Sequence, residues 1–269
     1  AGGNVRLGEP PCADMTELLG RFKANPRTVN LPLPPIMHGT GLLSAVGAMA
    51  SGGTCITLTS RSFEPELALE NITKHKVTQV TIVGDAFARP MLEVLDENPG
   101  KYDISSVGVI NSSGVMWTKE IKAGLLKHNQ NVLLSDAFSS SEAIGIGTSL
   151  MTKDQTIDVA KFALGPNCKV FSEDLKEVQP GTGESGMVAV KGFLPIGYYK
   201  DQEKTDKTFI VIGGIRYSIP GDWVRVEDDG SLTLLGRGSN CINTAGEKVY
   251  PEEVEEALKF HEAVADALV

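Results

Sequence analysis

The chain contains a run of serines that ends in a glutamate, in the stretch DAFSSSEA over residues 136–143. The run follows an apolar, strand-like segment, so its hydroxyls and backbone N–H groups are expected at the end of a strand. Such groups suit the oxygens of a phosphate, and the carboxylate of Glu142 suits Mg²⁺. A serine-rich loop that caps a following helix is the simpler interpretation of these residues taken alone. At this point both a phosphate site and a helix cap stay open.

A second candidate is an acid and a base that a hairpin brings together. The stretch VRVEDDGSLTLL, residues 224–235, alternates apolar and polar residues on both sides of an Asp-Gly pair. This pattern is typical of a β-hairpin. The hairpin would place Asp222 near the start of its first strand and Arg237 at the end of its second. The two side chains could hold one polar ligand, or they could form a salt bridge with each other.

The elements around these residues alternate between strand-like and helix-like runs from residue 27 to about 135. Short β-rich runs fall at 28–33, 54–59, 77–83, 106–113 and 131–138. Helix-like runs fall at 41–50, 65–76, 85–97 and 118–128. The alternation predicts an α/β fold with a doubly wound, mostly parallel sheet. Ligands of such sheets bind at the carboxyl ends of the strands, which here are residues 111–114 and 136–141.

The pattern changes at about residue 165, where helix-like runs give way to strand-like ones. The stretch CKVFSEDLKEVQPGTGESGMVAVKG, residues 168–192, predicts antiparallel strands around a PGTGE turn. The hairpin follows, and residues 249–261 then predict an amphipathic helix with Pro251 in its first turn. We therefore expect an antiparallel, β-rich subdomain after the parallel sheet.

Composition narrows the classes of partner. The 269 residues carry a net charge of −9 and no basic run, so nucleic acid is not expected as a partner. The four cysteines form no CxxC pair and there are four histidines, which favours reduced thiols in a cytoplasmic protein over a Cys/His metal site. The weakly charged stretch from His38 to Ser60 is rich in small residues and breaks at 51–53, so it predicts a helix and a buried strand rather than a membrane span. The chain begins with Ala, shows no signal peptide, and looks cut at both ends.

Six stretches follow one another in order: PLPPIMHGTG, SSGVMW, DAFSSSEA, GESGMVAVKGFLPIGYY, YSIPGDWVRVEDDGSLTLLGR and INTAGEKVYPEEVEEAL. In this order and spacing they resemble the motifs of the adenylate-forming superfamily of acyl-CoA synthetases, adenylation domains and luciferases. The similarity runs from Leu31 onward, and around GRGSNCINTAGEKVYPEEVE it is greatest to bacterial fatty-acyl-CoA ligases. It implies that Mg·ATP and a carboxylate form an acyl-adenylate, whose acyl group then passes to coenzyme A.

The resemblance implies a nucleotide site at two strand ends. Phe138 stands for the aromatic residue that stacks on adenine, Ser141 for the threonine that contacts phosphate, and Glu142 for the glutamate that holds Mg²⁺. Asp136 and Ala137 precede this motif, and Asp136 would reach the adenine amino group. On the other strand end, the backbone of Ser113, Gly114 and Val115 would lie along the adenine and the acyl pocket. The family's glycine after the aromatic residue is replaced by Ser139, which leaves the loop geometry open.

Three further residues take roles from the same resemblance. Asp222 matches an aspartate that accepts hydrogen bonds from the two ribose hydroxyls. Arg237 matches an arginine that contacts the ribose side and a neighbouring phosphate. His38 matches a histidine near the acyl carboxylate, and a role as a loop or helix-start residue is equally open. Trp117 is expected to pack a helix start rather than to line the acyl pocket.

The resemblance also implies how the chain is divided. Residues 1–235 would form part of the large adenylate-binding domain, with the parallel sheet to about 164 and the β-rich part at 165–235. Residues 236–241 would form a hinge, and residues 242–269 the beginning of a small C-terminal lid domain. Ser239 stands where the family usually has a charged hinge residue. Gly246 stands where a glycine lets the pantetheine arm of coenzyme A pass.

Two elements of the family are not matched, and several alternatives stay open. The phosphate loop is expected before Ala1 and the lid lysine after Val269, so the chain by itself is expected to be nearly inactive. The alternatives are a fatty-acyl-AMP ligase, an amino-acid adenylation domain that uses Asp85 for the substrate ammonium, and a non-catalytic nucleotide- or acyl-binding module. Acyl chain length and oligomeric state are not predicted, and peripheral membrane contact stays open.

Overall fold

The computed structural model describes residues 27–269 apart from 116, 155–160, 193, 239–241, 245–246, 250, 260, 262 and 265–266. These residues form two compact units. The α/β unit consists of residues 27–139 and 148–154, and the β-rich unit of residues 140–147 and 161–269. Ser239 and Gly246, the predicted hinge and coenzyme A passage residues, lie outside the described residues.

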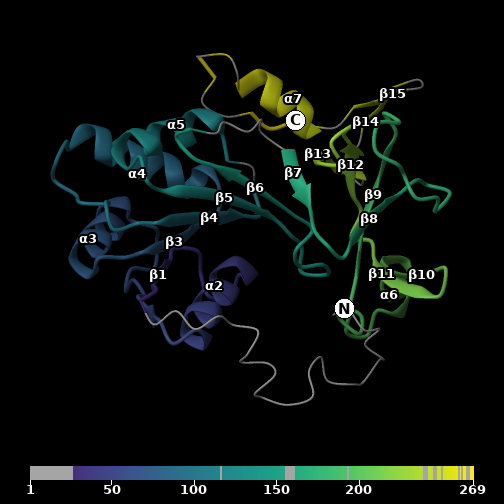
Figure 1. Ribbon diagram of the computed structural model, residues 1–269, viewed down its shortest axis with the longest axis horizontal. Coiled ribbons are helices and arrows are strands. Elements are labelled where there is room, and N and C mark those ends of the chain that lie inside the picture. Colours follow the sequence, from purple (N-terminus) through teal and green to yellow (C-terminus); the bar gives the residue numbers. More distant parts are fainter. Residues whose placement is uncertain are drawn as a thin grey trace. The chain divides into compact units, whose positions relative to one another are not determined.

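Parallel strands form the centre of the α/β unit in the order β2-β1-β3-β4-β5. The strands are β1 (Val29–Pro32), β2 (Thr54–Cys55), β3 (Gln79–Ile82), β4 (Val109–Ser113) and β5 (Leu133–Phe138), with β6 (Gly147–Met151) next to β5. The helices are α2 (Gly39–Ala50), α3 (Pro65–His75), α4 (Asp85–Glu97) and α5 (Lys119–His128). In Figure 1, α2 lies on the opposite side of the strands from α4 and α5. The doubly wound parallel sheet is therefore as the alternation predicts.

Helix α3 shows how the local sequence sets the bounds of an element. Pro65 lies in its first turn, where a backbone N–H has no partner within the helix, and Glu66 lies near the positive end of the helix dipole. Lys74 and His75 lie near the negative end. Lys76 then adopts a left-handed φ of 50° and ends the helix.

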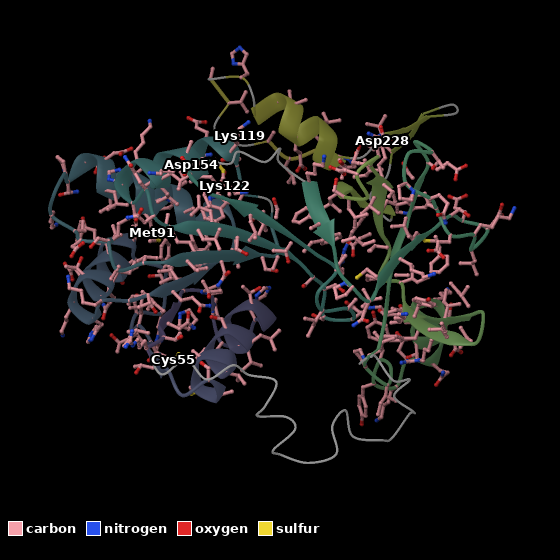
Figure 2. The ribbon with its side chains drawn as sticks, in the orientation of Figure 1. Cys55, Met91, Lys119, Lys122, Asp154 and Asp228 are labelled. Carbon is pink, nitrogen blue, oxygen red and sulfur yellow. The ribbon has the colours of Figure 1, made fainter. Side chains whose placement is uncertain are left out.

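The core of the α/β unit is formed by apolar strand residues and the helix faces that cover them. Leu31 of β1, Val80 of β3 and Leu134 of β5 are each at most 1% exposed. Leu125 of α5 and Met91 of α4 belong to the same core, and Figure 2 labels Met91. Trp117, just before α5, is 1% exposed and packs in this core, as predicted. Because the core holds the strands in register, the carboxyl ends of β4 and β5 lie side by side.

The β-rich unit is built on an antiparallel sheet in the order β10-β11-β9-β12-β13-β7, with β8 also paired to β9. Its strands are β7 (Lys161–Leu164), β8 (Cys168–Phe171), β9 (Ser185–Lys191), β10 (Phe209–Ile212), β11 (Ile215–Ser218), β12 (Asp222–Val226) and β13 (Leu232–Arg237). A small hairpin of β14 (Ile242–Thr244) and β15 (Glu247–Val249) precedes α7 (Pro251–Lys259). The predicted antiparallel part and the final amphipathic helix are therefore present.

Two details differ from the sequence-based expectations. The polar segment Gln202–Thr208 forms a short helix, α6, that was not predicted; Asp201 caps it by accepting a hydrogen bond from the Lys204 N–H at 2.9 Å. The helix-cap interpretation of residues 138–143 is wrong, because a loop follows β5 and the next element is the strand β6.

Among the described residues, no helix has the length and apolar character needed to cross a bilayer.

Candidate nucleotide site

The predicted site residues fall into two sets, one in each unit. The α/β unit contains His38, Ser113, Gly114, Val115, Asp136, Ala137 and Phe138. The β-rich unit contains Ser141, Glu142, Asp222 and Arg237.

In the α/β unit, the parallel register brings the two predicted strand ends together. Ser113 at the end of β4 pairs with Ala137 of β5, and Phe138 ends β5 one residue later. Gly114 follows β4 with a φ of +100°, a conformation that residues with a side chain rarely adopt. The chain therefore turns sharply after Ser113, and Val115 beyond the turn is exposed.

His38 lies beside this turn. A Cβ placed on Gly114 would be 3.8 Å from the His38 Cε1 atom. His38 is also the N-cap of α2, where its Nδ1 accepts a hydrogen bond from the Thr40 N–H at 3.3 Å. The predicted helix-start role is therefore confirmed, and the same ring lies next to the strand end proposed to carry the acyl pocket.

Asp136 has a partner that the sequence analysis missed. Its carboxylate forms a short salt bridge with the Lys122 ammonium, and the two side chains are 13% and 9% exposed. Burial raises the pKa of Asp136, the Lys122 charge lowers it, and Asp85 raises it further, with a net increase. The signal was present in the sequence, because Lys122 lies on the apolar face of α5 beside Ile121 and Leu125.

Asp85, the acid considered for an amino-acid substrate, is also engaged. Its Oδ1 accepts a hydrogen bond from the Thr118 N–H at 3.1 Å, and its Oδ2 pairs with Arg89 at 3.3 Å. Both carboxylate oxygens thus hold the start of α5 and the first turns of α4. This arrangement leaves Asp85 poorly suited to bind a substrate ammonium.

In the β-rich unit, Asp222 and Arg237 face each other across the hairpin, as predicted. They are directly opposed in the register of β12 and β13, and the Arg237 Nε atom lies 3.3 Å from the Asp222 Oδ1 atom. The Asp222 side chain is 10% exposed, whereas that of Arg237 is 56% exposed. The two residues do form a salt bridge, and the exposed guanidinium keeps a face toward solvent.

The carboxylate of Glu142 interacts with the positive charge of Arg237. Its Oε1 accepts a hydrogen bond from the Tyr198 hydroxyl at 2.5 Å. Partial burial raises the pKa of Glu142, but the Tyr198 hydrogen bond and the positive charge of Arg237 help to lower it overall. The carboxylate is therefore ionised at neutral pH. Burial and the hydrogen bond to Glu142 raise the pKa of Tyr198, so its hydroxyl remains a donor.

The ionised, partly exposed carboxylate of Glu142 could serve as one ligand of Mg²⁺. Among the described residues, no group of three or more His, Cys, Asp or Glu side chains could hold a metal ion. Mg²⁺ commonly uses one or two carboxylates together with the phosphates of a nucleotide. Glu142 suits that arrangement, in which the nucleotide supplies most of the ligands.

The chain is similar to known proteins along most of its length. A family model described as AMP-binding enzyme matches residues 12–199. The chain is 42% identical over 272 residues to a medium/long-chain-fatty-acid–CoA/3-oxocholest-4-en-26-oate–CoA ligase from Mycolicibacterium smegmatis, covering 100% of this chain and 49% of that protein. It is 44% identical over 261 residues to a 3-oxocholest-4-en-26-oate–CoA ligase from Rhodococcus rhodochrous, covering 95% of this chain and 47% of that protein. The chain thus spans about half the length of the curated relatives it matches.

Solved structures show the same fold at lower identity. An O-succinylbenzoate coenzyme A synthetase from Bacillus subtilis, in complex with AMP, matches with a TM-score of 0.74 and 22% identity, over 91% of this chain and 48% of that one. An amide bond synthetase from Marinactinospora thermotolerans matches with a TM-score of 0.74 and 23% identity, over 94% of this chain and 50% of that one. The family model covers well over half of the chain, and the fold agrees with it. The chain belongs to the AMP-binding enzyme family.

Proposed function

We propose that this chain serves an ATP-dependent acyl-CoA ligase, which activates a carboxylic acid as acyl-AMP and transfers the acyl group to coenzyme A. The observation that carries the proposal is the cluster of Glu142, Asp222 and Arg237 in the β-rich unit, at the positions of three family motifs. Family membership and the names of the most similar relatives support the same reaction class.

Each of the proposed site residues would contact a different part of the nucleotide. The buried carboxylate of Asp222 can accept hydrogen bonds from the two ribose hydroxyls. The exposed guanidinium of Arg237, fixed by its bond to Asp222, is available to a phosphate oxygen. The adenine contacts of Phe138 and of the backbone of residues 113–115 stay a prediction. Mg²⁺, when bound, would offset the charge of the phosphates, and Glu142 would hold it.

The reaction has two steps in which the bonds balance. An oxygen of the substrate carboxylate bonds to the α-phosphorus of ATP, and pyrophosphate leaves. The sulfur of coenzyme A then bonds to the acyl carbon, and AMP leaves while the thiol proton is released. The proposal places this chemistry in the cytoplasm, with ATP, a carboxylic acid and coenzyme A as the substrates.

We further propose a fatty acid or a steroid side-chain acid as the carboxylic acid, as the relatives' names suggest. The engagement of Asp85 by Thr118 and Arg89 supports this choice over an amino acid, because an ammonium group would lack a free acid there. A fatty-acyl-AMP ligase would share the first step only. The two are separated by whether AMP release needs coenzyme A.

Binding of AMP to this chain tests the proposal, with a matched pair of variants. Asp222→Asn removes the negative charge of the carboxylate that would accept hydrogen bonds from the ribose hydroxyls. Asp228→Asn changes an exposed acid in the turn of the same hairpin (Figure 2). Isothermal titration should show AMP binding to the wild type and to Asp228→Asn. Asp222→Asn should bind at least about tenfold more weakly, as expected for losing charged hydrogen bonds. Absence of AMP binding by the wild type would contradict the proposal.

The class of substrate is tested by a separate activity measurement, made on the complete polypeptide as the cell produces it. AMP release that depends on coenzyme A is measured with a fatty acid and with an amino acid. Release with the fatty acid alone supports the acyl-CoA ligase. Release with the amino acid would favour an adenylation domain, and AMP binding without any acyl transfer would favour a non-catalytic binding module.

A further inference from the structure

Tyr198 contacts Glu142 across a long stretch of the chain. The Tyr198 hydroxyl donates to the Glu142 Oε1 atom at 2.5 Å, although the two residues are 56 positions apart. Both belong to the β-rich unit. The contact is therefore a tertiary one, and it uses one of the two oxygens of the carboxylate proposed to hold Mg²⁺.

The local structure around Tyr198 fixes the position of its hydroxyl. The Tyr198 N–H donates to the Thr205 Oγ1 atom at 2.8 Å, and the Lys204 Nζ atom lies over the ring, 4.1 Å from its centroid. On Gly197, the preceding residue, a Cβ would lie only 2.5 Å from the Thr205 side chain. The ring of Phe209 lies 6.1 Å from that of Tyr198. Both the backbone and the ring of Tyr198 are thus held in place by contacts other than the hydrogen bond to Glu142.

A fixed donor matters because glutamate is a flexible side chain. Free rotation about its three torsions would spread its carboxylate over many positions, and binding of an ion would then cost that freedom. With Oε1 held by Tyr198, the remaining oxygen is confined to fewer positions. Preorganised ligands of this kind bind more tightly because less freedom is lost on binding.

We propose that Tyr198 is a positioning residue, whose hydroxyl holds Glu142 so that its second oxygen faces the Mg²⁺ of Mg·ATP. This inference rests on the proposed function, since it needs a nucleotide site in which Glu142 holds the metal ion. Tyr198 itself contacts neither the metal nor the nucleotide. Its neighbour Tyr199, which is 87% exposed, supplies a matched control.

The experiment measures the affinity of the chain for two ligands by isothermal titration. Tyr198→Phe removes the hydroxyl and keeps the ring with its contacts to Lys204 and Phe209. It should weaken Mg·ATP binding about 10-fold, which is the lower end of the loss expected for one hydrogen bond to a charged group. Metal-free AMP, which does not use Glu142, should bind to it as to the wild type. Tyr199→Phe should leave both affinities unchanged.

A second variant separates positioning from a structural effect. In Glu142→Gln, Mg·ATP binding should already be weak, and adding Tyr198→Phe should weaken it no further. Equal loss of AMP and Mg·ATP affinity in Tyr198→Phe, or no loss of either, overturns the positioning role. If the wild type binds AMP but Mg²⁺ gives ATP no added affinity, the metal role of Glu142 and this inference both fail. Failure of the wild type to bind AMP is different, because it refutes the proposed function itself.

Discussion

Lys122 gives the sharpest prediction on stability, because it is a buried cation that is paired with the buried carboxylate of Asp136. Its side chain is 9% exposed and that of Asp136 is 13% exposed. The Lys122 Nζ atom also lies 5.4 Å from the centroid of the Trp117 ring. The substitution Lys122→Met keeps the length of the side chain and removes the charge. It leaves Asp136 as an unpaired carboxylate in the interior.

The size of the effect follows from the burial of the pair. Removing one partner of a buried ion pair typically costs about 3–5 kcal/mol. We expect about 3 kcal/mol at pH 8, the lower end of that range, because Asp136 keeps a little contact with solvent. Protonation of Asp136 relieves part of this cost at low pH, and each pH unit above the folded-state pKa makes that protonation about 1.4 kcal/mol less favourable. At pH 5 the cost should therefore fall to about 1–2 kcal/mol.

The pH dependence of stability follows the pKa of Asp136, which burial raises in the folded state. A group whose pKa is higher in the folded state stabilises the fold most at low pH, and this contribution is lost as the pH rises through the folded-state pKa. The Lys122 charge lowers that pKa, so Lys122→Met raises it and moves the loss to higher pH. The variant should therefore lose stability between pH 5 and pH 8 more steeply than the wild type.

The assay is urea unfolding followed by the fluorescence of Trp117. The chain has two tryptophans, so a Trp223→Phe background leaves a probe within the α/β unit alone. A loss of about 3 kcal/mol corresponds to a fall of about 1.5 M in the urea midpoint, for a slope of about 2 kcal/mol per molar. Both pH values are measured on each variant.

Two controls make the result interpretable. Lys119→Met changes an exposed lysine on the same helix (Figure 2) and should stay within about 0.5 kcal/mol of the wild type. Lys122→Met combined with Asp136→Leu removes both charges and should recover most of the loss. The reasoning is refuted if Lys122→Met costs no more than Lys119→Met, or if its cost is the same at pH 5 and pH 8.

Three further predictions concern other residues. Burial raises the pKa of the Cys168 thiol to about 11. Iodoacetamide at pH 8 should therefore modify the partly exposed Cys55 faster than the buried Cys168, as measured by peptide mass spectrometry. Equal rates for the two cysteines would contradict this. A Cβ on Gly238 would lie 2.5 Å from the Trp223 Nε1 atom, so Gly238→Ala should shift the Trp223 fluorescence and lower stability by about 1–3 kcal/mol; an unchanged spectrum and urea midpoint would speak against this packing. At Gly114, where φ is +100° but a Cβ would meet only ordinary contacts, Gly114→Ala should cost about 1–2 kcal/mol from the backbone, measured by thermal unfolding, and a neutral effect would be inconsistent with that turn.

Much of the fold could be predicted because its local signals agree with one another. The segment 85–97 was predicted as a helix and forms α4 with those bounds. The Asp-Gly hairpin places Asp222 opposite Arg237, as its alternating pattern indicates. The segment 54–59 was predicted as a full strand, but only Thr54–Cys55 pairs, because β2 lies at the edge of the sheet and has one partner there.

The contacts that were missed join residues far apart in the sequence. The Tyr198–Glu142 hydrogen bond links two loops, and no periodic pattern in either loop points to the other. The Lys122–Asp136 pair had a weak signal, since a lysine on an apolar helix face needs a partner. That partner depends on which strand the helix covers, which is set by tertiary packing. Local patterns therefore indicate the elements, and the side-chain partners needed coordinates.

A crystal structure of the chain soaked with a non-hydrolysable acyl-adenylate analogue tests the proposed function most directly. The account predicts that the ribose hydroxyls donate to Asp222 and that Arg237 lies beside the phosphate position. Binding of the analogue without any contact to Asp222 or Arg237 would contradict it.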